Sequence, residues 1–275
     1  MSAGVTAVLS GGGVKAAAHL GAVRALIEAG LTPARYVGTS MGAVIATGFA
    51  AGLPAEEIGR RLMLVRQRDV FAVDRTAFIK GMWAKALLKP EPFRRTLAEL
   101  LPVTRFDDLV LPLTITATDL DSGAQLSFGD GGETVPLLDA LCASCALPLF
   151  FPPFLVGGRR CADGGLRSVV PLEVAGRFPA SLVAAVDVGP GFDMEPGTSP
   201  RAPALLGLQN DAQWALMASN TALARALWEA TPSRPPLLWI RPRVRRGETF
   251  ATDLLRWYID EGERAAKAAL SARDT

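Results

Sequence analysis

The sequence has almost no net charge and very few cysteines, and both shortages exclude classes of protein. Its 275 residues contain 29 lysines and arginines against 27 acidic residues, a formal net charge of +2. Proteins that bind nucleic acid concentrate basic residues, so this balance argues against nucleic acid as a partner. Three cysteines are an odd number in a long chain. A disulfide framework is therefore not expected, and we predict a cytoplasmic protein in a reducing compartment.

Long hydrophobic runs are missing as well. The longest apolar stretch, residues 141–156, is interrupted by Pro148, Pro152 and Pro153, which makes it unsuitable for a membrane-spanning helix. The first residues lack the basic and apolar regions of a secretory signal. Apolar residues nevertheless make up 49% of the chain, enough for a sizeable core. The length fits one large domain, which we expect to span residues 1–275.

A serine between two glycines is the most informative feature that is present. Residues 36–45 have the pattern of a short apolar strand, a sharp turn and an Ala-rich helix, with Gly38, Ser40 and Gly42 at the turn. This Gly-x-Ser-x-Gly spacing is typical of a nucleophile elbow, where small neighbours allow the backbone to reverse. The following helix points its positive end at the same place, which favours an oxyanion there. We predict a catalytic role for Ser40; the alternative is an ordinary turn that contains a serine.

A glycine-rich loop, Gly11 to Gly13, follows the first predicted strand (residues 5–9) and precedes a predicted helix at 14–29. Its backbone N–H groups can hold an anion. One hypothesis is an oxyanion hole that faces Ser40. The rival is a dinucleotide loop of an oxidoreductase, because Gly11, Gly13 and Ala16 fit its fingerprint. That fingerprint also expects an acidic residue at the end of the second strand, which is absent, so we favour the oxyanion hole.

A serine nucleophile needs a base, and histidine occurs only once in the chain, as His19. His19 falls within the first predicted helix among apolar residues, so we expect it to be packed rather than catalytic. The base is then predicted to be a carboxylate. Asp163 is the first candidate because two glycines follow it at a strand end, and Asp187 is the reserve. Direct contact between Asp163 and Ser40 is therefore expected.

Three further segments have compositions that predict their structural role. Residues 78–101 place apolar residues at helical spacing among lysines, which predicts packed helices; the alternative is a lipid-facing helical cap within residues 60–105. Residues 191–203 are rich in Pro, Gly and Ser and are expected to form a mobile loop. Cys142 and Cys145 form a single Cys-x-x-Cys pair. Without a second pair or a nearby histidine, they are expected to be core residues, with no metal.

Predicted strands alternate with helices along most of the chain, which indicates an α/β fold with one mostly parallel sheet covered on both faces. The later strands are predicted at residues 113–118, 124–128, 154–156, 159–161, 181–188 and 237–241. Long helices are predicted at 204–230 and 253–272.

Several of these blocks, in this order, resemble the patatin-like phospholipase family. The blocks are residues 11–21, 38–43, 118–123, 143–148, 151–153 and 163–165. The resemblance implies a three-layer α/β/α fold and a serine acyl hydrolase that needs no cofactor or metal. It implies Ser40 as nucleophile and Asp163 as base. The oxyanion hole would consist of backbone N–H groups among Gly11, Gly12, Gly13 and Met41, with Lys15, Gly38, Gly42, Gly164 and Gly165 as supporting motif residues.

The substrate implied by the resemblance is an acyl ester, either a phospholipid or a lysophospholipid. Peripheral contact at the inner face of a membrane is suggested separately by the apolar and basic residues of segment 78–101. Two positions depart from the family pattern: Lys15 stands where arginine is usual, and Ala16 where glycine is usual. Lysine keeps the charge but lacks the bidentate fork of arginine. A non-catalytic lipid-binding relative therefore remains the main alternative.

Overall fold

The computed structural model describes residues 4–66, 70, 72, 86–194, 204–245 and 254–273. Its centre is an eight-stranded sheet with the order β5-β6-β3-β2-β1-β7-β8, in which β4 also pairs with β3. The strands are β1 (Val5–Leu9), β2 (Pro33–Thr39), β3 (Leu113–Asp119), β4 (Gln125–Gly129), β5 (Phe154–Val156), β6 (Arg159–Asp163), β7 (Leu182–Val186) and β8 (Leu237–Ile240). The pairs from β3 through β2, β1 and β7 to β8 are parallel, whereas β4, β5 and β6 join in antiparallel pairs. The predicted α/β class with a mostly parallel sheet is confirmed.

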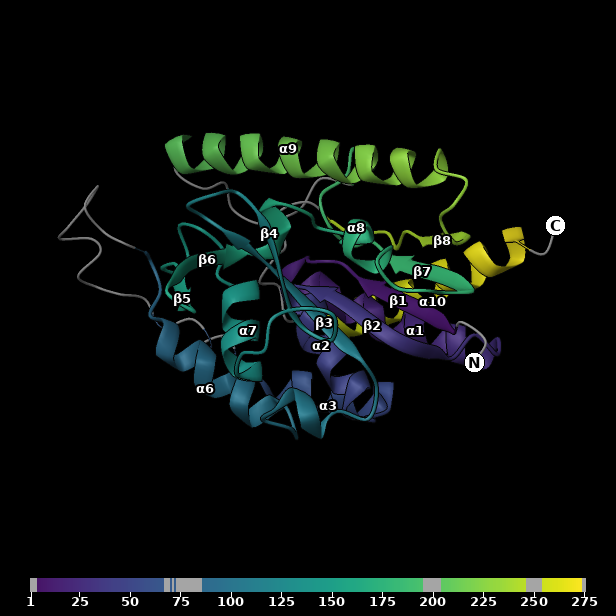
Figure 1. Cartoon of the computed structure of the whole chain (residues 1–275), viewed down its shortest axis with the longest axis horizontal. Coiled ribbons are helices and arrows are strands. Elements are labelled where there is room, and N and C mark those ends of the chain that lie inside the picture. The colour runs from purple at the N-terminus through teal and green to yellow at the C-terminus, as the bar shows by residue number, and fades with distance from the viewer. Residues whose placement is uncertain are drawn as a thin grey trace.

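Helices cover both faces of this sheet and produce three layers (Figure 1). The α-helices are α1 (Ala18–Glu28), α2 (Met41–Ala50), α3 (Ala55–Leu64), α6 (Pro90–Leu100), α7 (Leu137–Ser144), α8 (Leu172–Ala175), α9 (Ala204–Glu229) and α10 (Leu255–Arg273). Three short 3-10 helices are η1 (Gly13–Ala17), η3 (Phe106–Asp108) and η4 (Gly164–Leu166). Helices α8 and α9 lie above the sheet in Figure 1, and α2 and α3 lie below it. Residues of α1 and α10 pack into the same buried cluster as those of α2.

The burial of β1 explains why its sequence is apolar throughout. All five of its residues are buried. Because side chains alternate across a strand, Ala7 and Leu9 pack with the helices of one face, while Val8 packs with α8 and the end of α9 on the other. A parallel strand covered on both sides has no wet face, so its pattern is a continuous apolar run.

The first predicted helix is divided in two. The sequence predicts one helix over residues 14–29, but the chain first forms η1 and continues as α1 from Ala18. Gly13 enters this turn with a φ of 60°, a left-handed conformation that glycine adopts without strain. The tighter 3-10 turn keeps the glycine loop close to the sheet before the regular helix begins.

One edge of β3 aligns the ends of two other strands. Along that edge β2 pairs up to Thr39 opposite Thr116, and β6 then ends with Asp163 opposite Ala117, the next residue of β3. The other edge is occupied by β4. Since β2 runs parallel to β3 and β6 runs antiparallel to it, their carboxyl ends meet head to head. The residues at these two ends are therefore close in space although the sequence separates them widely.

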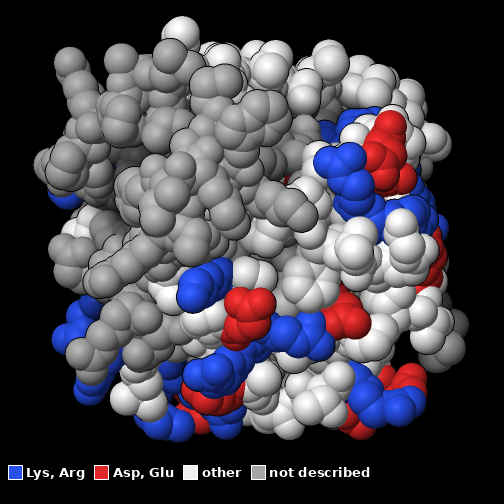
Figure 2. All heavy atoms as spheres, turned by 90° about the vertical axis from the view of Figure 1, so that its left-hand side faces the viewer, with Lys and Arg blue, Asp and Glu red and all other residues white. Residues whose placement is uncertain are grey.

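Helix α6 confirms part of the packing predicted for residues 78–101, because Phe93, Leu97 and Leu100 are buried. The rest of that segment up to residue 85 lies outside the described residues, and so do residues 195–203 of the predicted mobile loop. Figure 2 shows the side of the molecule that carries α6. Basic and acidic side chains lie next to one another on the described part of this side. On α6 itself, Arg94 forms an ion pair with Asp139 of α7.

Candidate active site

Ser40 lies at a strained turn between β2 and α2. It is the N-cap residue of α2, with φ 53° and ψ −133°, a conformation that few L-residues adopt. Close backbone packing explains both neighbouring glycines. A Cβ on Gly38 would lie 2.5 Å from the Cα of Ala43, and a Cβ on Gly42 would lie 2.3 Å from the carbonyl oxygen of Ser10. The predicted elbow geometry is thus present, and it packs closely against the end of β1.

The Ser40 hydroxyl donates a hydrogen bond to the carboxylate of Asp163. Its Oγ lies 2.7 Å from Asp163 Oδ2, without an intervening imidazole. The other carboxylate oxygen, Oδ1, accepts the N–H of Gly165 at 2.7 Å. Gly164 allows this turn to form because a Cβ there would lie 2.5 Å from the carbonyl oxygen of Thr116. The predicted contact between serine and aspartate is present, and the glycines after Asp163 hold its carboxylate in place.

Burial changes the proton affinity of Asp163. The side chain is almost fully enclosed, and this desolvation raises its pKa to about 6, although the hydrogen bonds from Ser40 and Gly165 oppose the rise. A carboxylate with that pKa accepts a proton more readily than an exposed aspartate does, yet remains mostly ionised at neutral pH. This combination is suited to a general base.

The glycine loop lies beside Ser40, as expected, but not all of its backbone N–H groups are available to bind an oxyanion. A Cβ on Gly11 would lie 3.3 Å from the Cβ of Ser40. The N–H of Gly11 donates to the carbonyl of Val169 at 3.1 Å, so Gly11 is not an oxyanion donor, contrary to the prediction. Gly12 is the N-cap of η1, Gly13 is its first residue, and Met41 is the first residue of α2. Amides in the first turn of a helix have no acceptor within it, so these three can donate to a ligand.

Sequence reasoning missed the role of Ser144, the last residue of α7. Its buried Oγ accepts the N–H of Ser40 at 2.8 Å, which fixes the backbone of the strained turn. The following residue, Cys145, places its thiol beside Ser40 and Asp163, and burial raises the pKa of this thiol well above its ordinary value. A thiol that stays protonated is a poor nucleophile. Residues 143–148 are one of the blocks that resemble the family, but nothing in the sequence indicated that Ser144 contacts the backbone of Ser40.

His19 and Asp187 are not part of this pair. His19 is fully buried in α1, its Nε2 is 2.9 Å from the carbonyl oxygen of Ser10, and burial lowers its pKa to about 4. It is a neutral, packed side chain, as predicted. Asp187, the reserve candidate for the base, forms an ion pair with Arg241 at 2.9 Å instead of contacting Ser40. Asp187, kept as the reserve, is therefore not the base, because the half-buried Arg241 already holds its carboxylate.

A cavity of about 490 Å³ opens next to this pair. Its volume lies within the range of about 300–1,000 Å³ that is common for small-molecule sites. Apolar side chains from α2, α3 and α6 line one part: Ile45, Leu62, Phe93, Leu97 and Leu100. Trp214 and Met217 of α9 line another part, and Ser40, Asp163 and the glycine loop contribute polar groups. The arrangement can enclose an apolar chain with its reactive end at Ser40.

Neither a membrane-spanning helix nor a cluster of metal ligands occurs among the residues that the structure describes. In the described ranges, no helix combines the length and apolar character needed to cross a bilayer. Nor do three or more His, Cys, Asp or Glu side chains of the described residues gather into a possible metal site. Cys142 and Cys145 are both buried as unpaired thiols, in agreement with their predicted place in the core.

The chain is similar in sequence to known proteins over about two thirds of its length. A protein of Mycobacterium tuberculosis described as an uncharacterised NTE family protein is 30% identical over 200 residues, covering 71% of this chain and 53% of that protein. Rat patatin-like phospholipase domain-containing protein 7 is 29% identical over 192 residues, covering 67% of this chain and 14% of that protein. The chain thus spans about half the length, or less, of these two relatives.

The fold is shared with a solved structure. The crystal structure of VipD from Legionella pneumophila matches 99% of this chain and 67% of its own, with a TM-score of 0.51 and 16% identity. The model of the family described as patatin-like phospholipase matches residues 7–175, a range that includes the glycine loop, Ser40 and Asp163. This match covers more than half of the chain, and the chain therefore belongs to the patatin-like phospholipase family.

Proposed function

We propose that this protein is a serine acyl-ester hydrolase of the phospholipase or lysophospholipase type. The observation that carries the proposal is the hydrogen bond of 2.7 Å between the Ser40 hydroxyl and the Asp163 carboxylate, at the wall of an apolar cavity. Membership of a family of lipid acyl hydrolases supports the same chemistry. The substrate is an ester whose acyl chain enters the cavity.

In the proposed acylation step, Ser40 Oγ attacks the ester carbonyl carbon while its proton moves to Asp163 Oδ2. The carbonyl oxygen becomes an oxyanion, which the amides of Gly12, Gly13 and Met41 stabilise. The positive end of α2 adds to this stabilisation because Ser40 is its N-cap. The tetrahedral intermediate collapses, the C–O bond to the leaving alcohol breaks, and protonated Asp163 supplies the proton that the alcohol takes.

In the proposed deacylation step, water replaces the alcohol. Asp163 takes a proton from the water as its oxygen attacks the acyl-enzyme carbonyl, and the same amides bind the second oxyanion. Collapse of that intermediate breaks the bond to Ser40 Oγ, which regains its proton from Asp163. The fatty acid then leaves, and both side chains are in their initial protonation states.

Ser40→Ala should remove this activity. We expect hydrolysis of p-nitrophenyl esters to fall by roughly 10⁴-fold or more, because the attacking hydroxyl is lost. The measurement is release of nitrophenol over a series of acyl chains from butyrate to palmitate, whose optimum also gives the length of chain that the cavity accepts. Labelling with a fluorophosphonate probe should be lost in parallel.

Ser219→Ala is the matched control, since Ser219 is exposed on α9 and its loss should leave both signals intact. Equal background rates in wild type and Ser40→Ala would contradict the proposal. Binding of phospholipid vesicles without hydrolysis would then favour a lipid-binding relative that has no catalytic activity. For the active enzyme, comparing phospholipid with lysophospholipid vesicles separates the two lipid classes.

The pH dependence of the reaction should follow Asp163. Its pKa is raised to about 6 by burial, and only the ionised carboxylate can accept the serine proton. We expect kcat/KM to be flat above about pH 7 and to fall about tenfold per pH unit well below pH 6. The assay should include enzyme returned from each pH to neutral buffer, so that loss of folded protein is distinguished from reversible protonation. Activity that persists unchanged to pH 4 would exclude Asp163 as the base.

A further inference from the structure

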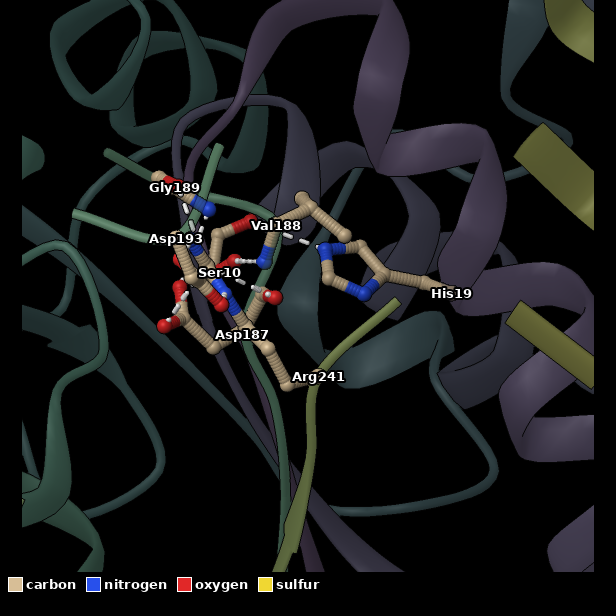
Figure 3. Close-up of polar contacts among 7 residues, drawn as sticks. All are labelled: Ser10, His19, Asp187, Val188, Gly189, Asp193 and Arg241. Atoms are coloured by element: carbon tan, nitrogen blue, oxygen red, sulfur yellow. Dashed lines mark hydrogen bonds and ion pairs between the residues drawn. The ribbon is translucent and has the colours of Figure 1, made fainter. Parts of the chain in front are cut away.

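Arg241 follows β8 directly and reaches the segment after β7, residues 187–193 (Figure 3). Its side chain is only 18% exposed. Nη1 donates to the carbonyl oxygens of Asp187 at 3.1 Å and Gly189 at 3.0 Å, and lies 2.9 Å from Asp187 Oδ2. Nε and Nη2 bind the two carboxylate oxygens of Asp193 at 3.1 Å and 2.8 Å. One guanidinium thus holds two backbone carbonyls and two acidic side chains.

The segment that Arg241 holds supports the glycine loop from behind. The N–H of Val188 donates to Ser10 Oγ at 2.8 Å, and the Val188 carbonyl oxygen lies 3.0 Å from the point where a Cβ on Gly12 would be. On the other side of Ser10, Nε2 of His19 contacts its carbonyl oxygen (Figure 3). Ser10 is therefore fixed between α1 and the segment after β7, immediately before the loop.

We propose that Arg241 is a positioning residue that sets the place of the Gly12 and Gly13 amides relative to Ser40. The connection runs from Arg241 through the carbonyls of residues 187 and 189 to Val188, and from Val188 to Ser10 and Gly12. Its kinetic consequence depends on the proposed hydrolase function. The connection itself is a property of the fold and can be measured without turnover.

Arginine suits this position better than lysine does. Its planar group carries five N–H donors in fixed directions, so it can serve several acceptors at once without rotating. A lysine keeps the charge opposite Asp187 but has a single nitrogen, which cannot reach both carbonyls and Asp193 together. Charge-assisted hydrogen bonds are also stronger than neutral ones, and the two from Arg241 to the carbonyls are partly buried, which makes the carbonyl positions well defined.

The test compares Arg241→Met and Arg241→Lys with Arg234→Met. Arg234 is also half-buried and donates to a backbone carbonyl, that of Gly176 at 2.7 Å, but this contact lies at the end of α8 and outside the connection from Arg241 to the glycine loop. We expect Arg241→Met to lower kcat by roughly 10- to 100-fold with KM changed less than about twofold, since small displacements of catalytic groups have effects of this size. Arg241→Lys should be intermediate, and Arg234→Met should keep a kcat close to wild type.

A transition-state analogue separates positioning from general loss of structure. A trifluoromethyl ketone with the best acyl chain forms an oxyanion on reaction with Ser40, whereas the corresponding carbinol does not. Arg241→Met should weaken inhibition by the ketone by the same factor as kcat and leave inhibition by the carbinol unchanged. Equal losses for both compounds, or equal defects in Arg241→Met and Arg234→Met, would overturn the proposal. If Arg241→Met does not fold, Arg241→Lys provides the same comparison.

Hydrogen exchange gives the readout that does not require activity. In Arg241→Met, the amides of residues 9–17 should exchange faster than in wild type, while those of α7 should not change. Faster exchange in a protein whose wild type has no esterase activity would support the positioning role and reject the proposed function. Unchanged exchange together with unchanged kcat in an active enzyme would reject the positioning role and leave the proposed function intact.

Discussion

Asp163→Asn should make the protein more stable and nearly inactive. We expect kcat to fall by roughly 10³- to 10⁵-fold, because asparagine cannot take the proton of Ser40 and no histidine stands between them. At the same time the free energy of unfolding at pH 8 should rise by about 1–3 kcal/mol, because the substitution removes a buried charge while the side chain keeps nearly the same shape. Thermal or denaturant unfolding and an esterase assay measure the two effects on the same samples.

The sign of the stability change follows from the pKa of Asp163. Burial raises it from 3.8 in the unfolded chain to about 6 in the folded protein. Between these values the folded state binds more protons than the unfolded state, so stability is lost as the pH rises through this window. The full penalty is present above about pH 6 and absent below about pH 4. The gain from Asp163→Asn should therefore shrink on acidification and vanish near pH 4.

Asp119→Asn is the matched control at the end of β3. The carboxylate of Asp119 accepts the N–H of Asp121 and the hydroxyl of Ser122, and these hydrogen bonds lower its pKa. Its replacement should destabilise the protein slightly, opposite to Asp163→Asn, and leave the esterase rate unchanged. Loss of stability in Asp163→Asn at pH 8 would show that its ionised form is favoured by the fold, contrary to our interpretation.

Gly42→Ala should damage both catalysis and stability. The added Cβ would lie 2.3 Å from the carbonyl oxygen of Ser10 and 2.4 Å from that of Leu9, so the backbone at the end of β1 must move. That movement shifts the glycine loop away from Ser40. We expect kcat to fall by more than about 100-fold. Unfolding should require about 1–3 kcal/mol less, as for other overpacked cores.

Gly48→Ala on the same helix is its control. There the added methyl would meet only the side chain of Ile58, at 2.9 Å and 3.0 Å, which can rotate aside. Alanine also has a helix propensity about 1 kcal/mol better than glycine, so stability should stay within about 1 kcal/mol of wild type. The two variants differ in what the methyl contacts and not in the chemistry of the substitution. Equal kcat in Gly42→Ala and Gly48→Ala would contradict the role assigned to the close packing beneath Ser40.

Most of the fold could be predicted from local patterns. The alternation of apolar strands with helices indicated the α/β class, and α9 was predicted within one residue of its bounds. Segment 14–29 was less accurate, because the close packing of the glycine loop imposes a 3-10 turn at Gly13–Ala17 that helix propensity does not encode. Hydrophobic periodicity identifies elements well, but tertiary contacts set where they end.

The sequence by itself determined the two turns of the candidate site. Gly38, which packs against Ala43, and Gly13, with its φ of 60°, are local requirements of backbone geometry, so both turns are visible as motifs. Gly42 is needed for a tertiary reason, because a Cβ there would meet the carbonyl oxygen of Ser10.

Only the tertiary structure decided which aspartate meets Ser40. Asp163 ends β6 and Asp187 follows β7, so both lie at the end of a strand. Pairing with β3 brings the end of β6 to the end of β2, next to Ser40, whereas Asp187 forms an ion pair with Arg241.

The tertiary structure also decided which amides of the loop can bind an oxyanion and what supports them. The N–H of Gly11 donates to the carbonyl oxygen of Val169, and the N–H of Ser40 donates to Ser144 Oγ. In both hydrogen bonds the two residues are more than a hundred positions apart in the sequence. The physical reason is the same in each case. A motif specifies the conformation of a few adjacent residues, whereas a hydrogen bond across the sheet depends on strand order and register, which the whole chain determines.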